Sequence, residues 1–194
     1  RKPNTEGLKL EEIGVKLNEK KSIEINSKFK TSVDGIYAIG DVVPGPMLAH
    51  KAEEEGVACV ELISGQKPHI NYEMIPAIVY TNPEVASVGK TETELKANKI
   101  DYKIGKFPFM ANGRALTTSS PEGFVKILAD SKTDAILGAH IIGHDAGQLI
   151  AEIVTTMEFG GSSEDIARIC HAHPTTSEAV KEAAMNIEGR AIHI

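Results

Sequence analysis

The sequence lacks the features that mark several classes of protein. It has no tryptophan, and aromatic residues make up only 5% of its 194 positions. No apolar run approaches the ~20 residues that a helix needs to cross a bilayer. Basic residues do not dominate either, since 21 Lys and Arg stand against 27 Asp and Glu. This balance argues against a general nucleic-acid-binding protein, which is usually basic.

Cysteine is scarce as well. Cys59 and Cys170 lie far apart in the sequence, which excludes a disulfide framework and a Cys-x-x-Cys zinc site and suits a reducing compartment. What is present, 41% hydrophobic and 25% charged residues with a net charge of −6, is typical of a globular protein. The length allows one large domain or two small ones. Residues 1–5 show no initiator Met, signal pattern or helix start, so we expect a fragment of a longer protein.

The first third of the chain predicts strands. Residues 22–26 alternate polar and apolar side chains, as a half-buried strand does. Residues 36–39 form a continuous apolar run, which suits a strand buried on both faces. This run ends at Gly40 and Asp41, and a loop rich in proline and glycine follows, through which no helix can run.

The next segment is predicted to be a helix. Four residues recur at helical spacing on one face: Ala52, Gly56, Cys59 and Ile63. Gly65 is the expected stop signal. We therefore expect Cys59 to be a packed helix residue rather than a reactive thiol.

A domain boundary is expected between Gly65 and Tyr72, where the pattern has no periodicity. After it, strands come first and helices last, which predicts an α+β layout. Strands are expected at residues 77–80, 102–108, 123–129 and 136–142, and helices after Thr91, around residues 149–157, after Ser162 or Ser163, and after Pro174. The turn at residues 131–134 predicts that the last two strands pair antiparallel.

The segment from Cys170 to Glu178 is the most informative for chemistry. Thr175 and Glu178 have the spacing of a capping box, which is the simplest role for Glu178. Alternatively, Glu178 accepts a hydrogen bond from His173, whose backbone is restricted by Pro174. That carboxylate would fix the ring tautomer, favour the imidazolium form and leave the other nitrogen to take a proton. The spacing alone leaves both roles open.

Histidine and cysteine side chains also raise the question of a metal site. Cys170, His171 and His173 are nearly consecutive, but a tetrahedral zinc site needs a fourth ligand at a suitable spacing, and none is obvious. His140 falls in a strand pattern, so it does not share a helix face with His144. We therefore expect no metal site, and we expect His140 and His144 to be structural or exposed.

Two further segments could contact a ligand. Asp41 follows a predicted buried strand, a common place for a carboxylate that binds a sugar hydroxyl, although it could equally cap the following loop. Residues 47–50 lie where a helix is expected to start, and free N–H groups there can face an electron-rich or anionic ligand atom. The alternative for this segment is an ordinary apolar helix start.

These sites together resemble a known family. Residues 31–41 are similar to the second flavin-binding motif of the disulfide-oxidoreductase flavoproteins. Three further segments resemble the dihydrolipoamide dehydrogenases in particular: residues 47–50, 80–84 and 171–178. Shorter matches to the same family lie at residues 107–109, 138–140 and 164–168. The resemblance covers essentially the whole chain. Its two-histidine form favours this family over glutathione reductase, and the lack of a C-terminal cysteine pair disfavours mercuric reductase and the thioredoxin reductases that carry C-terminal thiols.

The resemblance implies a domain organisation. Residues 1–6 would be the exit segment of an NAD domain, residues 7–70 the last part of an FAD-binding domain, and residues 71–194 the dimerisation domain, an antiparallel sheet with flanking helices. The chain would be the C-terminal portion of a flavoenzyme that oxidises protein-bound dihydrolipoamide with NAD⁺ as acceptor. It contains neither the GxGxxG loop for the FAD pyrophosphate nor the Cys-x₄-Cys redox disulfide, so we expect it alone to be inactive and to bind FAD weakly or not at all.

The resemblance also assigns roles to residues. His173 would be the catalytic base and Glu178 its orienting carboxylate, with a cis bond between His173 and Pro174. Cofactor contacts are implied for Asp41, Met47, Leu48, Ala49, His50 and Pro174. The implied partners are a second copy of the chain, as a homodimer that completes the active site, and lipoyl domains of 2-oxo acid dehydrogenase or glycine cleavage complexes, in bacterial cytoplasm or mitochondrial matrix. The alternative is a non-catalytic dimerisation module in which His173 and Glu178 only cap a helix.

Overall fold

The computed structural model describes residues 1–194. It divides into two compact units, Arg1–Ile70 and Asn71–Ile194, and each has its own apolar clusters. None of its helices has both the length and the apolar character needed to span a membrane.

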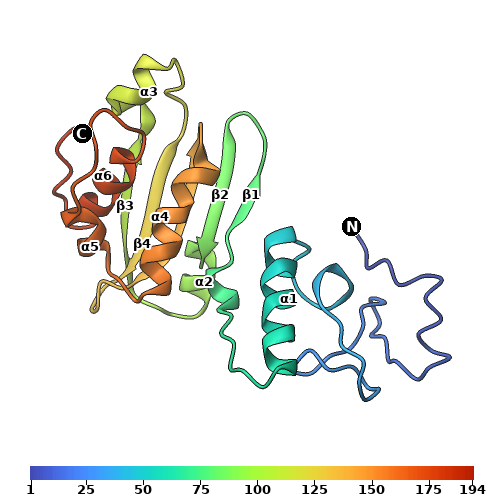
Figure 1. Cartoon of the computed structure of the whole chain (residues 1–194). Coiled ribbons are helices and arrows are strands. Elements are labelled where there is room, and N and C mark those ends of the chain that lie inside the picture. The colour runs from blue at the N-terminus through green and yellow to red at the C-terminus, as the bar shows by residue number, and fades with distance from the viewer. The chain divides into compact units, whose positions relative to one another are not determined.

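The first unit consists mostly of loops around one long helix, α1, which spans Ala49–Ile63 (Figure 1). The short 3-10 turn η1 covers Gly40–Val42. One apolar cluster lies among the loops, and a second joins Phe29 to Ala58 and Cys59 of α1. The burial of Cys59 in this cluster confirms that it is a packed helix residue.

The prediction of two strands in this unit is wrong. Residues 22–26 and 36–39 each contribute only one residue to an isolated bridge, Ile23 in the first segment and Tyr37 in the second. A strand needs a neighbouring extended segment along its length, and residues 1–70 offer these segments only single-residue partners. The run 36–39 is therefore half-buried for the most part rather than enclosed on both faces.

The helix α1 is where the sequence predicts it, but its most buried face is shifted by one residue from the predicted face, on which Cys59 is buried and Ala52 and Gly56 are half-buried. The helix ends at Ile63, and Gly65 follows two residues later with a φ of +84°. The buried residues are Lys51, Glu55, Ala58 and Cys59. Ile63, which the spacing places on the buried face, is 58% exposed. The apolar pattern misplaced the face because two charged residues, Lys51 and Glu55, occupy it.

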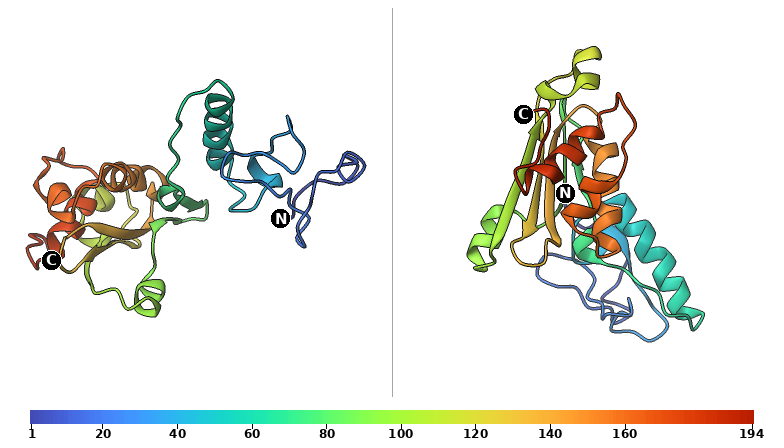
Figure 2. Two further views of the ribbon diagram at one scale, coloured as in Figure 1. Left: turned by 90° about the horizontal axis from the view of Figure 1, so that it is seen from below. Right: turned by 90° about the vertical axis from the view of Figure 1, so that its left-hand side faces the viewer.

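The second unit is a five-stranded antiparallel sheet with helices (Figures 1 and 2), which confirms the expected α+β layout and antiparallel sheet but adds a fifth strand to the four predicted. The strands are β1 Ala77–Val79, β2 Glu84–Gly89, β3 Tyr102–Pro108, β4 Phe124–Asp130 and β5 Ile136–Gly143, in the order β1-β2-β5-β4-β3. The helices are α2 Glu92–Ala97, α3 Gly113–Thr117, α4 Ala146–Glu158, α5 Ser163–Arg168 and α6 Glu178–Asn186, with 3-10 turns η2 Tyr72–Met74 and η3 Phe109–Ala111. Figure 2 shows α4, α5 and α6 on one face of this sheet.

Alternation along the strands builds the core under these helices. Val125 and Ile127 of β4 and Ile141 of β5 are almost fully buried, and they share one apolar cluster with Ile150 and Ile153 of α4. Side chains two positions apart on a strand point to the same face. One face of the sheet is therefore apolar and carries the helices.

The turn at residues 131–134 has a second task besides joining β4 to β5. Asp134 has a φ of +61°, and its carboxylate accepts hydrogen bonds from the Ser163 hydroxyl at 2.6 Å and the Glu164 backbone N–H at 2.8 Å. The turn thus also stabilises the N-terminus of α5. The antiparallel pairing of β4 with β5 is confirmed.

Local signals located most other elements of this unit. The capping box of α2 is confirmed, because the Glu94 N–H donates to the Thr91 hydroxyl at 3.2 Å and the Thr91 N–H donates to the Glu94 carboxylate at 2.8 Å. The strand β2 was not predicted. Its small residues Ala86, Ser87 and Gly89 give a weak strand pattern, and pairing with β1 and β5 forms it instead.

Gly105 allows α6 to pack against β3, and we expect Gly105→Ala to destabilise the second unit. A Cβ there would lie 2.0 Å from the carbonyl oxygen of Ala183 and 2.9 Å from the Ile187 side chain. Overpacking of this kind costs about 1–3 kcal/mol, which urea unfolding would measure. Gly113→Ala is the matched control, because a Cβ there meets nothing within 4 Å. Equal losses in both variants would contradict the packing argument.

Candidate functional site

The imidazole of His173 faces the carboxylate of Glu178 at the start of α6. His173 Nδ1 lies 3.0 Å from Oε1 and 3.2 Å from Oε2 of Glu178. An ionised carboxylate only accepts hydrogen bonds, so Nδ1 carries the hydrogen and Nε2 keeps its lone pair in the neutral ring. The His173 side chain is 77% exposed, and Nε2 makes no hydrogen bond within the chain. The ring can therefore take a proton from a molecule that arrives from solvent.

Glu178 forms only half of the predicted capping box. Its Oε2 accepts a hydrogen bond from the Thr175 backbone N–H at 2.9 Å. The Thr175 hydroxyl, however, donates to the Ala172 carbonyl oxygen at 2.7 Å, and α6 begins only at Glu178, with Ser177 as an N-cap that makes no side-chain cap. The capping-box prediction is wrong because Thr175 belongs to the loop before the helix. Glu178 is thus free to serve both the loop backbone and His173.

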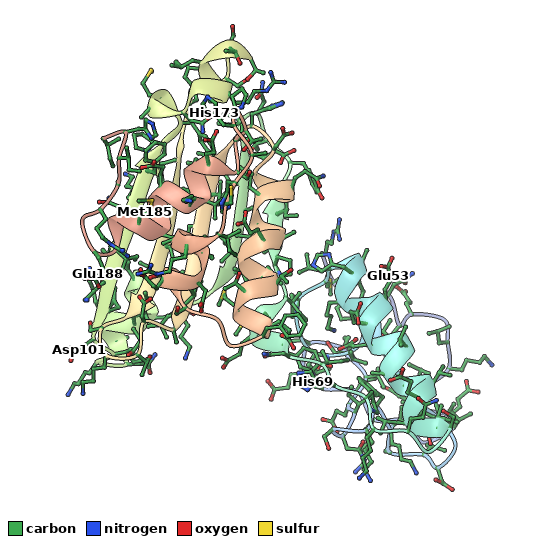
Figure 3. All side chains as sticks on the ribbon, turned by 60° about the vertical axis from the view of Figure 1, so that its left-hand side comes forward. Glu53, His69, Asp101, His173, Met185 and Glu188 are labelled. Carbon is green, nitrogen blue, oxygen red and sulfur yellow. The ribbon has the colours of Figure 1, made fainter.

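Side chains from two helices hold this loop. The amide of Asn112, a buried side chain at the N-cap of α3, donates to the Thr175 carbonyl oxygen at 3.0 Å. Lys181 of α6 donates to the Ile169 carbonyl oxygen at 2.9 Å. The His173–Pro174 peptide bond is cis, as expected. Figure 3 places His173 at the end of the second unit where α3 lies.

His171, two residues earlier, points into the unit. Its side chain is 6% exposed, Nε2 lies 2.6 Å from Oε1 of Glu152, and Nδ1 lies 3.1 Å from the Ile169 carbonyl oxygen. Both ring nitrogens are therefore occupied. From the sequence, His171 is recognised only as a possible zinc ligand and as part of a motif. Its partner Glu152 lies 19 residues earlier on α4, so no local pattern shows the pairing.

The charge state of Glu178 follows from its surroundings. Burial raises the pKa of this carboxyl, but the hydrogen bonds from the Thr175 backbone and the His173 ring, together with the charges of His173 and His193, outweigh burial and lower the pKa. Glu178 is therefore ionised at neutral pH and can stabilise positive charge on the His173 ring.

The lowered pKa of Glu178 predicts a pH-dependent stability. A carboxyl whose folded pKa is below its unfolded value stabilises the fold above the unfolded pKa, and this stabilisation is lost as the pH falls through the folded pKa. Glu178→Gln should be less stable than the unchanged chain near about pH 7, and the difference should shrink toward about pH 3. Urea unfolding at both pH values measures this. A difference that stays constant would refute it.

In the first unit, Asp41 lies within η1 and is exposed. The helix α1 begins at Ala49, inside the predicted segment 47–50, and its N-cap residue Leu48 provides no side-chain cap. Gly40, just before Asp41, has a φ of +73°, and a Cβ there would lie 3.1 Å from the Ala52 Cβ. Glycine is therefore required for η1 to pack closely on α1.

A buried ion pair, which the sequence pattern did not indicate, fixes this same point. Lys51 Nζ lies 3.0 Å from Glu55 Oε1, and the two side chains are 1% and 2% exposed. The Gly40 N–H donates to Glu55 Oε2 at 2.7 Å, and Lys51 donates to the Gly40 carbonyl oxygen at 3.3 Å. The pair thus binds both polar groups of Gly40 and holds η1, with Asp41, against α1. The spacing of four residues was the available signal, but most such pairs are exposed.

The remaining histidines of the second unit do not form a site. His140 lies on β5 opposite Ser87 of β2 and Lys126 of β4, and burial, followed by the charge of Lys126, lowers its pKa. His144 is exposed and lies 3.4 Å from Asp145. No group of three His, Cys, Asp or Glu residues in the structure could hold a metal ion.

Comparison with known proteins shows which family the chain belongs to. Residues 75–184 match the family described as "pyridine nucleotide-disulphide oxidoreductase, dimerisation domain", and residues 1–56 match the family described as "pyridine nucleotide-disulphide oxidoreductase". The first match alone covers more than half of the chain. The chain therefore belongs to the pyridine nucleotide-disulphide oxidoreductase family.

Within this family, similar proteins include dihydrolipoyl dehydrogenases. Dihydrolipoyl dehydrogenase 2 of Arabidopsis thaliana mitochondria is 59% identical over the whole chain, and the mitochondrial enzyme of Pisum sativum is 57% identical. A leghemoglobin reductase of Glycine max is 58% identical over 95% of the chain. The chain spans only 38%, 39% and 35% of the lengths of these three relatives.

Solved structures agree with the family assignment. LpdA from Mycobacterium tuberculosis superposes with a TM-score of 0.89 at 28% identity, over 96% of this chain and 41% of that protein. The flavoprotein disulfide reductase RclA from Escherichia coli, as its Cu(II) complex, gives 0.88 at 25% identity, over 95% of this chain and 42% of that protein.

Proposed function

We propose that this chain is the part of a dihydrolipoyl dehydrogenase that supplies the acid/base pair and the subunit interface. The whole enzyme would oxidise protein-bound dihydrolipoamide to lipoamide with NAD⁺ as acceptor. The observation that carries the proposal is the contact between His173 Nδ1 and Glu178, which leaves an exposed Nε2 able to accept a proton. The names and high identity of the relatives support the choice of substrate.

His173 would act on the thiols of the substrate. Oxidation of a dithiol to a disulfide releases two protons and two electrons, so a base is needed at the thiol. We propose that Nε2 of His173 accepts the first proton and that the negative charge of Glu178 stabilises the resulting imidazolium. General base catalysis of this kind contributes about 10²–10⁴-fold to a rate. Glu178 is a positioning residue in this scheme, because it acts through His173.

The residues of the first unit fit one side of an FAD site. Asp41 presents an exposed carboxylate that can accept hydrogen bonds from hydroxyl groups, and the N-terminus of α1 has no side-chain cap over its N–H groups. When bound, FAD would supply two-electron transfer between the thiols and NAD⁺. We assign cofactor contacts to Asp41, residues 47–50 and Pro174. Because the chain has no GxGxxG loop and no Cys-x₄-Cys, we propose that alone it binds FAD weakly or not at all and is inactive.

The proposed domains follow the same scheme. Residues 1–6 would be the exit segment of an NAD domain, residues 7–70 the end of the FAD domain, and residues 71–194 the dimerisation domain. The matches to residues 1–56 and 75–184, and the division of the structure after Ile70, support this assignment.

We further propose that the chain forms a homodimer through its second unit. The dimerisation-domain match supports this, and lipoyl domains of 2-oxo acid dehydrogenase or glycine cleavage complexes would be the partners of the whole enzyme. The proposed compartment is the mitochondrial matrix, as the names of the plant relatives suggest, with bacterial cytoplasm as the alternative. Sedimentation at micromolar concentration should show a dimer, and a monomer alone would count against the proposal.

A chimera tests the catalytic proposal. The part of the Arabidopsis enzyme that precedes the matched region would be joined to this chain, which is 59% identical to the segment it replaces. We expect the chimera to oxidise dihydrolipoamide with NAD⁺ and the chain alone not to. A chimera that binds FAD but fails to oxidise the substrate would favour the alternative of a non-catalytic dimerisation module.

A further inference from the structure

The segment that carries His173 is anchored by the second histidine of the same motif. Residues 169–177 form neither helix nor strand, so their path depends on side-chain contacts. The His171 ring provides one such contact, because it reaches Glu152 of α4 at 2.6 Å and the carbonyl oxygen of Ile169 at 3.1 Å. The ring therefore ties this segment to α4 two residues before His173.

The partners of the His171 ring define where its hydrogens are. A carbonyl oxygen only accepts, so Nδ1 must carry a hydrogen toward Ile169. An ionised carboxylate also only accepts, so Nε2 must carry one toward Glu152. The geometry is that of an imidazolium–carboxylate pair with a charge-assisted hydrogen bond.

The charged and titratable groups around this ring come from three segments. Glu152 of α4 is negative, and Lys181 of α6 is positive, with its Nζ 2.9 Å from the same Ile169 carbonyl oxygen. Cys170 precedes the ring in the loop, and its Sγ lies 4.0 Å from the His171 carbonyl oxygen. Burial of the ring and the charge of Lys181 both oppose a positive charge on His171, so Glu152 is the group that favours the protonated ring.

The helix that carries Glu152 is bound to the sheet at its first turn. The N–H of Gly147, in the first turn of α4, donates to the Glu84 carboxylate of β2 at 2.9 Å. A line of contacts therefore runs from β2 through α4 to His171 and the loop. It ends at the residue proposed to take the proton.

We propose that His171 is a positioning residue: a buried imidazolium, held by Glu152, that fixes the loop so that His173 meets Glu178. The inference rests on the proposed role of His173 and deepens it. The two histidines of the motif have different hydrogen positions for different tasks. His171 carries a hydrogen on each nitrogen and holds the backbone, whereas the neutral form of the His173 ring has its hydrogen on Nδ1 and its lone pair exposed.

Nitrogen-15 NMR of the histidine rings in the whole chain tests this proposal. At about pH 7.5, we expect His171 to give the signals of a doubly protonated ring, and we expect the neutral form of His173 to carry its hydrogen on Nδ1. Glu152→Gln keeps the side-chain shape but removes the charge. It should convert His171 to a neutral ring and shift His173 toward the form with hydrogen on Nε2.

Two variants on the same helix complete the experiment. Glu158→Gln, at the exposed end of α4, is the matched control and should leave both rings unchanged. Glu152→Asp keeps the charge and should retain the doubly protonated His171 in a larger fraction of molecules than Glu152→Gln does.

A neutral His171 ring in the unchanged chain would overturn the proposal, and so would a His173 tautomer that survives Glu152→Gln. If Glu152→Gln does not fold, the spectrum of the unchanged chain still decides the protonation state. None of these measurements uses turnover, so their failure would leave the chimera test of the proposed function intact.

Discussion

Replacing His173 with Gln in the chimera should lower the rate of dihydrolipoamide oxidation by about 10²–10⁴-fold, because the neighbouring Glu178 has a lowered pKa and is a much weaker base than an imidazole. The ring is 77% exposed and makes its only hydrogen bonds to Glu178, so its loss should leave the fold intact. Steady-state kinetics with NAD⁺ in excess measure the rate, and circular dichroism checks the fold.

Two further variants define the meaning of that loss. Glu178→Gln should reduce the rate less than His173→Gln, because the ring remains and loses only its orientation and its nearby negative charge. His144→Gln removes an exposed histidine of the same unit and should leave the rate unchanged. If His173→Gln reacts as fast as His144→Gln, the assignment of the base is wrong.

Replacing Lys51 with Met should destabilise the first unit by about 3–5 kcal/mol, the cost of leaving one partner of a buried ion pair without the other. Glu55 would stay buried without the ammonium group that lies 3.0 Å from its Oε1, and the Gly40 carbonyl oxygen would keep only its bond from the Val43 N–H. The unit has only small apolar clusters, so this loss is large relative to what holds it together. Amide hydrogen exchange in α1 measures the change.

An exposed pair in the same unit provides the control. Lys9 lies 3.5 Å from Glu12, and their side chains are 73% and 67% exposed. Lys9→Met should change the free energy of unfolding by at most about 1 kcal/mol, because solvent screens such pairs. If the amides of α1 exchange as slowly in Lys51→Met as in Lys9→Met, the buried pair does not hold the unit.

The parts of the fold that the sequence predicts are those with local signals. The strand β3 was located to the residue by its pattern, and the capping box of α2 by the spacing of Thr91 and Glu94. The pairing of His173 with Glu178 was also within reach, since the two are five residues apart. In each of these, the interacting groups lie close together in the chain.

The parts that could not be predicted depend on distant partners. Residues 22–26 and 36–39 have strand patterns, but whether a strand forms depends on a neighbour that the pattern does not specify. The contact of His171 with Glu152 needs α4 and the loop to fold against each other first. The burial of Lys51 and Glu55 likewise depends on η1, because their hydrogen bonds to Gly40 compensate for the loss of water.

The most direct test of the central claim is the anaerobic reaction of the chimera with one substrate at a time. Stopped-flow absorbance follows flavin reduction by dihydrolipoamide and, separately, by NADH. With His173→Gln we predict that reduction by dihydrolipoamide slows by about 10²–10⁴-fold while reduction by NADH keeps its rate. If both reactions slow equally, or if neither slows, His173 is not the base that acts on the thiol.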